Sequence, residues 1–259
     1  MTSTDVGHRR AGGAGGVGGA VHRAVAAELA AVRDRAPGRA PRVLDVGGGS
    51  GAWAVPLATA GCAVSVVDPS PNALAALRRR ARDAGVEELV KAVPGEVERL
   101  AEVAPLGQAD LVLGHGLLEV VDDPHTAVRA LAGAAAPAGA VSVLVAGRFA
   151  AVLARTLAGR LTEARTLLAD PDGRFGPDDA LRRRLDVAGL RRALAAAPEL
   201  RLELLQGDGV VECWAPGTSR EREGGGASAT LGELEELAAA ESALIDVAAR
   251  LHAIARRVG

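Results

Sequence analysis

The sequence has 259 residues, with 30 Lys and Arg against 32 Asp and Glu, which gives a formal net charge of −2 at pH 7. A chain of this length can bury the core of one large domain. Its near balance of charge excludes a protein-wide field that would draw it to nucleic acid or to a membrane surface. Hydrophobic residues make up 49% of the chain but aromatic residues only 2%, so we expect a core of small aliphatic side chains.

The N-terminal segment and the cysteines bear on the compartment. Residues 1–19 are rich in glycine and lack the apolar core of a signal peptide, so they predict a flexible tail. No apolar run approaches the length that spans a bilayer. Cys62 and Cys213 have neither a metal-ligand spacing nor a disulfide framework, which is typical of buried thiols in a reducing compartment. We therefore expect a cytoplasmic protein without a bound metal and without membrane contact.

Helical and extended segments alternate through the first part of the chain. Apolar residues at helical spacing predict a helix over 20–35, which ends before Pro37 and Gly38. The segments expected after it are a strand over 42–46, a helix over 52–60, a strand over 63–67, a helix over 69–84, strands over 89–93 and 110–114, a helix over 124–135 and a strand over 140–146. This alternation is typical of βαβ units, in which helices cover both faces of a parallel sheet.

A different pattern follows later in the chain. Two short apolar runs, 201–205 and 210–215, flank Gly207-Asp208-Gly209, which predicts an antiparallel hairpin. The expected fold class is therefore α/β, with a Rossmann-like, mostly parallel sheet that ends in an antiparallel strand.

Three further regions lie outside this plan. Residues 148–184 are rich in Arg, Leu and Asp and predict an inserted helical cap within a domain over 20–216. Residues 217–230 are polar and glycine-rich, which is typical of a linker. Residues 231–259 carry an apolar stripe that predicts a long C-terminal helix. That stripe could pack on the sheet or pair two subunits, so a homodimer stays open.

The most informative segment, Val43 to Gly51, reads V-L-D-V-G-G-G-S-G. The spacing of Gly47, Gly49 and Gly51 is compatible with a nucleotide-cofactor loop, with a dinucleotide loop or with a plain tight turn. Asp45 discriminates between the first two, because a carboxylate there would repel a pyrophosphate. The same carboxylate would attract a cofactor that carries a positive charge and a free amine.

Asp68 follows the second predicted strand, where an acidic residue hydrogen-bonds ribose hydroxyls in nucleotide-binding folds. Alone it is also compatible with a turn residue that caps a helix. Together, Asp45, Asp68 and the predicted hairpin over 201–215 indicate S-adenosyl-L-methionine as the cofactor, with S-adenosyl-L-homocysteine as the product.

Three motifs resemble those of the class I S-adenosylmethionine-dependent methyltransferases. They are V-L-D-V-G-G-G-S-G at 43–51, V-V-D-P-S at 66–70 and A-D-L-V-L-G-H-G-L-L-E-V-V-D-D-P at 109–124. The resemblance covers roughly residues 21–216. It implies a methyltransferase activity and a seven-stranded sheet whose last strand is antiparallel.

The segment G-H-G-L-L-E-V-V-D-D-P is also similar to that of the bacterial tRNA 5-carboxymethoxyuridine methyltransferases, which esterify a carboxylate on a wobble uridine. This narrower resemblance implies that Arg23 meets the methionine carboxylate of the cofactor, that Asp68 holds the ribose and that Glu96 lies near the adenine amine. The expected cofactor-binding residues are Arg23, Asp45, Gly47, Gly48, Gly49, Gly51, Asp68, Pro69, Gly95, Glu96 and His115. Phe149 and Phe175 are the only aromatic residues of the cap, and this aromatic poverty departs from that group, although arginines of the cap could also stack an anticodon base.

His115 is the candidate catalytic base, because a histidine at the end of a central strand faces the cofactor crevice. It is also compatible with a histidine that packs against the cofactor or bonds to the backbone. Glu119 is compatible with a carboxylate in the first turn of a helix, and Asp122 and Asp123 with a helix cap. Trp53 could wall the cofactor pocket or fill the core.

Two arginine runs could grip phosphates. The run at 78–82 favours a solvated helix face, whereas the run at 182–184 lies near the cap and stays open. Three functions remain: a small-molecule O-, N- or C-methyltransferase, a tRNA wobble-uridine carboxyl methyltransferase, and a cofactor-binding protein without catalysis.

Overall fold

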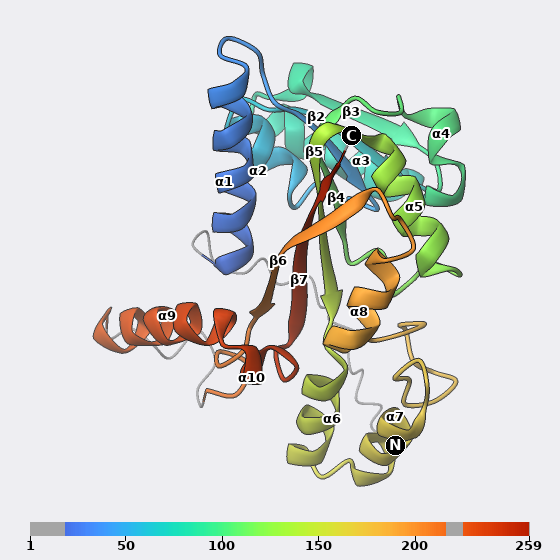
Figure 1. Ribbon diagram of the computed structural model, residues 1–259, viewed down its shortest axis with the longest axis vertical. Coiled ribbons are helices and arrows are strands. Elements are labelled where there is room, and N and C mark those ends of the chain that lie inside the picture. The colour runs from blue at the N-terminus through green and yellow to red at the C-terminus, as the bar shows by residue number, and fades with distance from the viewer. Residues whose placement is uncertain (1–18, 216–224, 259) are drawn as a thin grey trace, which may run out of the picture.

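The computed structural model of the chain describes residues 19–215 and 225–258 (Figure 1). Apart from Gly19, the tail expected over 1–19 lies outside these residues, as does the linker expected over 217–230 as far as residue 224. Residues 225–230 belong to a helix, so the linker prediction was wrong for that part. The reason is that this end of the segment joins the apolar helical sequence that follows it.

Seven strands of the described chain form one sheet, in the order β3-β2-β1-β4-β5-β7-β6. Their bounds are β1 (Arg42–Val46), β2 (Ala63–Asp68), β3 (Val90–Pro94), β4 (Ala109–His115), β5 (Ala135–Ala146), β6 (Leu200–Asp208) and β7 (Arg250–Arg257). Strands β1 to β5 pair in parallel, and β7 pairs antiparallel with both β5 and β6. The prediction of a Rossmann-like, mostly parallel sheet of seven strands with an antiparallel last strand is confirmed.

Helices cover both faces of this sheet (Figure 1). Helices α1, α2 and α3 pack on one face, and α4, α5 and α8 pack on the other. The bounds are α1 (Ala20–Arg35), α2 (Ala54–Thr59), α3 (Pro71–Asp83), α4 (Leu100–Val103), α5 (Pro124–Ala134), α6 (Arg148–Leu157), α7 (Leu161–Ala169), α8 (Val187–Leu194), α9 (Gly225–Ala240) and α10 (Ser242–Ile245). Successive residues of β1, Val43 and Leu44, enter opposite clusters, as expected for a strand that is buried on both sides.

Local signals explain where two helices begin. The Ser70 hydroxyl accepts a hydrogen bond from the Ala73 amide at 3.3 Å, so α3 starts at Pro71 and not at Pro69 as predicted. The Asp123 carboxylate accepts from the amides of His125 and Thr126 at 2.9 and 3.1 Å, which caps α5. The interpretation of Asp123 as a helix cap is therefore confirmed.

The predicted hairpin over 201–215 was wrong in its second strand. Strand β6 runs on through Gly207 and Asp208, and its partner is β7, not residues 210–215. The backbone amides of Val210 and Val211 donate instead to the carboxylate of Glu235 on α9, at 2.6 and 2.8 Å. The Glu235 carboxylate thus accepts the hydrogen bonds that these backbone amides would have donated to a second hairpin strand.

The prediction of one long helix over 231–259 was also wrong. Only α9 and the short α10 are helical there, and β7 follows (Figure 1). Residues Leu251 to Ala255 are all buried, because β7 lies between β5 and β6 and is covered on both faces. Such a strand shows no alternation of apolar and polar residues, and its Leu, Ala and Arg residues favour a helix locally.

The region 148–184 follows β5 at the carboxyl edge of the sheet. It begins with α6 and α7, which project beyond the end of β5 (Figure 1). An irregular segment then leads to α8, and Arg148 donates to the carbonyls of Leu168 and Asp170 at 2.9 and 2.6 Å.

In the described residues, no helix has the length and apolar character that crossing a bilayer requires.

Candidate functional site

The glycine loop after β1 has a backbone that other residues adopt only with strain. Gly47, Gly49 and Gly51 have φ values of 73°, 57° and 81°, which lie in the left-handed region that favours glycine. The Gly47 amide donates to the Val67 carbonyl at 2.8 Å, which ties the loop to the end of β2. A Cβ at Gly51 would clash with Leu77 of α3. The loop is therefore held in one shape at the carboxyl end of β1.

Asp45 lies directly under this loop. Its carboxylate is only 2% exposed, and a Cβ on Gly48 would overlap it. Within the described residues, Asp45 Oδ2 has no hydrogen-bond partner. Burial, reinforced by the charge of Asp68, raises the pKa of Asp45 to about 7. A cationic or hydrogen-bond-donating ligand placed above the loop would therefore stabilise the Asp45 carboxylate.

Asp68 joins the two loops at the carboxyl ends of β1 and β2. Its Oδ2 accepts a hydrogen bond from the Gly49 amide at 2.9 Å, and its Oδ1 accepts from the Ser70 amide at 2.8 Å. These bonds fix a nearly buried carboxylate at the edge where nucleotide ribose groups bind in sheets of this topology.

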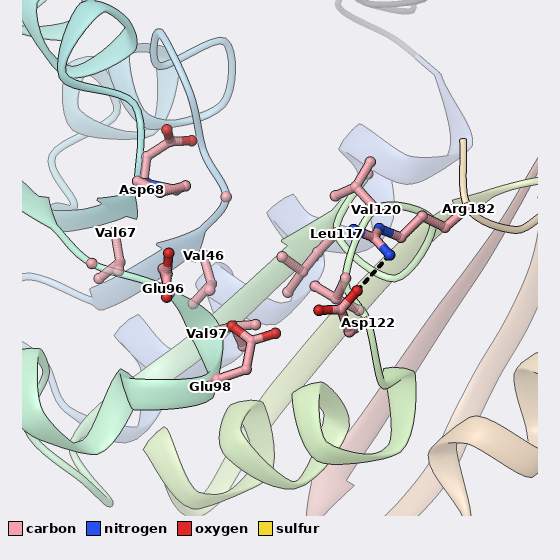
Figure 2. Close-up of a pocket in the computed structure, with 15 residues that line it drawn as sticks. Val46, Val67, Asp68, Glu96, Val97, Glu98, Leu117, Val120, Asp122 and Arg182 are labelled. Carbon is pink, nitrogen blue, oxygen red and sulfur yellow. Dashed lines mark ion pairs between the residues drawn. The ribbon is translucent and has the colours of Figure 1, made fainter. Parts of the chain in front are cut away.

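A cavity of about 460 Å³ opens beside Asp68 (Figure 2). It is formed where the carboxyl ends of β1, β2, β3 and β4 meet. The predicted cofactor residues that line it are Gly47, Asp68, Pro69, Gly95 and Glu96. The remaining lining residues were not predicted for the cofactor site; they are Val46, Val67, Val97, Glu98, Gly116, Leu117, Val120, Val121, Asp122 and Arg182.

The charges of this cavity are mostly negative. Asp68, Glu96, Glu98 and Asp122 line it, and the cation Arg182 is paired with Asp122 at 2.5 Å (Figure 2). Such a lining would repel a dinucleotide pyrophosphate, whereas hydroxyl, amine and sulfonium groups suit it. The residues present thus fit S-adenosyl-L-methionine better than a nicotinamide dinucleotide.

Some of the cavity-lining residues that were not predicted could have been found from a motif in the sequence. Gly116 and Leu117 belong to the G-H-G-L-L motif, and Gly116 has a φ of 74° that places the turn beside the glycine loop. A Cβ on Gly47 would lie 3.2 Å from the Leu117 side chain. Glu98 had no such signal, because only the short turn Val97–Arg99 brings it to the cavity beside Glu96.

Arg183 holds the turn that forms one wall of the cavity. Its buried guanidinium donates to the carbonyls of Leu118, Val121 and Asp122 at 2.6, 2.6 and 2.9 Å. Arg184 pairs with Asp179 at 2.5 Å. The run at 182–184 is therefore engaged with protein groups.

The other arginine run, at 78–82, lies on α3, and its arginines are exposed.

His115 lies at the end of β4 but does not line this cavity. Its Nε2 is 2.8 Å from the hydroxyl of buried Ser142, and that hydroxyl is 2.8 Å from Nε2 of buried His252. Trp53 contacts the His115 ring edge-on at 4.7 Å, and His22 of α1 stacks on Trp53 at 4.2 Å. Burial, with a smaller effect of neighbouring charges, keeps the pKa of His115 well below its usual range.

Glu119 is a further acid near the site whose surroundings raise its pKa. Helix α5 begins at Pro124, so Glu119 lies in the preceding turn and not in the first turn of the helix. Burial raises the pKa of Glu119 to about 7, and Oε2 has no hydrogen-bond partner in the described part of the chain. A carboxyl group in this state can hold a proton near neutral pH.

Arg23 lies on α1, where it pairs with Glu236 of α9 at 2.7 Å. Both side chains are about half exposed, and Arg23 is not among the cavity-lining residues. Its contact with the methionine carboxylate therefore stays a prediction. Within the described residues, no group of three or more His, Cys, Asp or Glu side chains could hold a metal ion.

Comparison with known proteins gives the following relationships. Residues 20–192 match the family model described as "Methyltransferase domain". The chain is 42% identical over 98 residues to the ubiquinone biosynthesis O-methyltransferase of Bordetella bronchiseptica, a match that spans 38% of this chain and 39% of that protein. It is 32% identical over 152 residues to the protein of the same name from Xanthomonas euvesicatoria, which spans 59% of this chain and 61% of that one.

Solved structures agree with this family at the level of the fold. Geranyl diphosphate C-methyltransferase from Streptomyces coelicolor, solved with Mg²⁺, geranyl diphosphate and S-adenosyl-L-homocysteine, superposes with a TM-score of 0.54. The sequence identity is 16%, and the superposition covers 92% of this chain and 80% of that one. Because the family model matches more than half of the chain, the protein belongs to the methyltransferase domain family, and its seven-stranded, mostly parallel sheet has the class I fold.

Proposed function

We propose that the protein is an S-adenosyl-L-methionine-dependent methyltransferase that acts on a small-molecule acceptor. The observation that carries this proposal is the acidic cavity beside the left-handed glycine loop, with the buried Asp45 under that loop.

The cofactor would lie across the loops that follow β1, β2 and β3. Asp68 would accept hydrogen bonds from the ribose hydroxyls, and Glu96 and Glu98 would lie at the adenine end of the cavity. Asp45 would favour the ammonium group through its charge. When bound, S-adenosyl-L-methionine supplies a methyl group on a sulfonium, which is already a strong electrophile. The protein then has to orient the acceptor and exclude water.

Two observations favour a small acceptor over an anticodon base. The matched relatives carry the name ubiquinone biosynthesis O-methyltransferase, so an oxygen acceptor is the first class to test. In the cap, the Arg155 guanidinium lies 4.2 Å from the centre of the Phe175 ring, so this aromatic face is already covered. Stacking of an unpaired base normally requires such a face to be free.

The acceptor can be tested by incubating the full chain with methyl-labelled cofactor and either a metabolite extract or bulk tRNA. We expect label in small molecules and none in tRNA. Label in tRNA alone would overturn the small-molecule proposal and support the narrower tRNA resemblance.

Asp68→Ala serves as the matched control for this experiment, because its label incorporation should fall with cofactor affinity. Cofactor binding without label transfer to any fraction would favour the third possibility, a binding protein without catalysis.

A further inference from the structure

A chain of buried polar side chains runs from His115 across the sheet. It consists of His115 on β4, Ser142 on β5, His252 on β7 and Gln206 on β6. The two contacts of the Ser142 hydroxyl are 2.8 Å each, and Gln206 Nε2 is 3.0 Å from His252 Nδ1. Ser142 and His252 are fully buried, so water does not compete for these hydrogen bonds. Four adjacent strands therefore contribute one side chain each to a single network.

The chemistry of these four side chains fixes which atom donates and which accepts in each hydrogen bond. Because Gln206 Nε2 is a donor, His252 Nδ1 must be its bare acceptor and His252 Nε2 must carry the hydrogen. That hydrogen is donated to the Ser142 oxygen, and the Ser142 hydroxyl then donates to His115 Nε2. His115 is left with its hydrogen on Nδ1.

His115 Nδ1 is the unpaired atom at the end of this series of hydrogen bonds. It is buried and has no hydrogen-bond partner in the described residues, although the ring as a whole is partly exposed. Leaving a buried donor unpaired is unfavourable, so a ligand oxygen that reaches Nδ1 would be stabilised there. Burial also lowers the pKa of His252, to about 4, which keeps this ring neutral within the chain.

We infer that Gln206, His252 and Ser142 are positioning residues that fix His115 as the Nδ1–H tautomer, a hydrogen-bond donor for a ligand oxygen and not a general base. The role of that donor in methyl transfer rests on the proposed function. The tautomer itself can be measured without turnover, so the tautomer assignment and the proposed function can fail separately.

Side-chain ¹H–¹⁵N correlation spectra test the inference directly, because they distinguish protonated from bare histidine nitrogens and the chain has only 5 histidines. In the unmodified protein we expect His115 with Nδ1 protonated and Nε2 bare. Gln206→Glu should reverse the chain: its carboxylate accepts from His252 Nδ1, Ser142 donates to His252, and His115 becomes the Nε2–H tautomer with a bare Nδ1.

Two controls make the result specific. Gln108→Glu makes the same chemical change at an exposed position before β4 and should leave the His115 signals unchanged. Ser142→Ala cuts the chain, so adding Gln206→Glu to it should no longer shift the His115 tautomer.

Nε2–H in the unmodified protein would overturn the inference, and so would a His115 tautomer that is the same in folded Gln206→Glu. If Gln206→Glu does not fold, the unmodified protein and Ser142→Ala still decide: unchanged His115 signals in Ser142→Ala would refute the relay.

Discussion

Asp45 and Asp68 are close neighbours at the glycine loop, but their surroundings differ. Asp68 accepts two backbone hydrogen bonds. Asp45 is buried with one oxygen unpaired, and burial raises its pKa to about 7. The sequence indicated both residues from their positions relative to the strands. It could not indicate this difference, because burial and backbone contacts depend on the packed loop.

This difference predicts a pH dependence of folding stability. The folded pKa of Asp45, about 7, lies above the unfolded value of about 4, so the folded state binds the proton more tightly. Its contribution is therefore present at low pH and is lost as pH rises from about 4 to about 7. Asp45→Asn should remove this loss, and its stability relative to the unmodified protein should rise over that interval by up to about 4 kcal/mol.

Denaturant unfolding of both proteins across this pH range measures the effect. Asp34→Asn, at an exposed position on α1, is the matched control and should show no such trend. A constant difference between Asp45→Asn and the unmodified protein would contradict the assignment.

At the level of the element, the loop requires glycine for two reasons: some positions have a left-handed φ, and at another a neighbouring side chain leaves no room for a Cβ. Gly48 has no left-handed φ, yet a Cβ there would overlap the Asp45 carboxylate. The motif predicted a cofactor loop, but only the structure shows that this glycine serves the acid beneath it.

Gly48→Ala should therefore displace the loop and weaken cofactor binding at least about tenfold, a loss of roughly 1.4 kcal/mol. The control is Gly232→Ala on α9, where nothing lies within 4 Å of an added Cβ. Calorimetric titration of both variants compares them. If Gly48→Ala and the unmodified protein bind the cofactor with equal affinity, the close contact between Gly48 and Asp45 is not needed for cofactor binding.

The turn after β4 is a second element whose shape depends on a distant residue. Arg183 is separated in sequence from the three carbonyls that it binds by 65, 62 and 61 residues. Arg183→Met would leave these buried acceptors unpaired and should lower the free energy of unfolding by about 3 kcal/mol. It should also weaken cofactor binding, since the turn lines the cavity.

Arg165→Met, on the exposed side of α7, is the matched control and should change stability by less than about 0.5 kcal/mol. Chemical denaturation and calorimetry measure the two properties. An Arg183→Met variant as stable as the control would refute the structural role of this arginine.

For the whole molecule, sequence patterns predicted the fold well where contacts are local. The alternation from residue 20 to residue 146 corresponds closely to α1 through β5, where three of the four strand pairs join strands that are consecutive in sequence. The C-terminal part differs, since β7 inserts between β5 and β6 and bonds Ser142 to His252 over a separation of 110 residues. Amino-acid preferences alone favoured a helix there.

The same distinction applies to the site. The motifs predicted the parts of the cavity that lie on single loops, such as Gly47 and Asp68. Arg182 comes from the segment after the cap and reaches the cavity only through tertiary packing. The relay from Gln206 to His115 likewise requires four strands in one order, which no short motif encodes.

The central claim is that this cavity binds S-adenosyl-L-methionine, and calorimetric titration of the full chain tests it most directly. We predict binding of S-adenosyl-L-methionine and S-adenosyl-L-homocysteine with dissociation constants on the order of micromolar, as is typical of metabolite sites. Asp68→Ala should bind at least about tenfold more weakly, because it loses the bond to the Gly49 amide and the proposed hydrogen bonds to the ribose. No heat with either compound, in protein that unfolds cooperatively, would contradict the account.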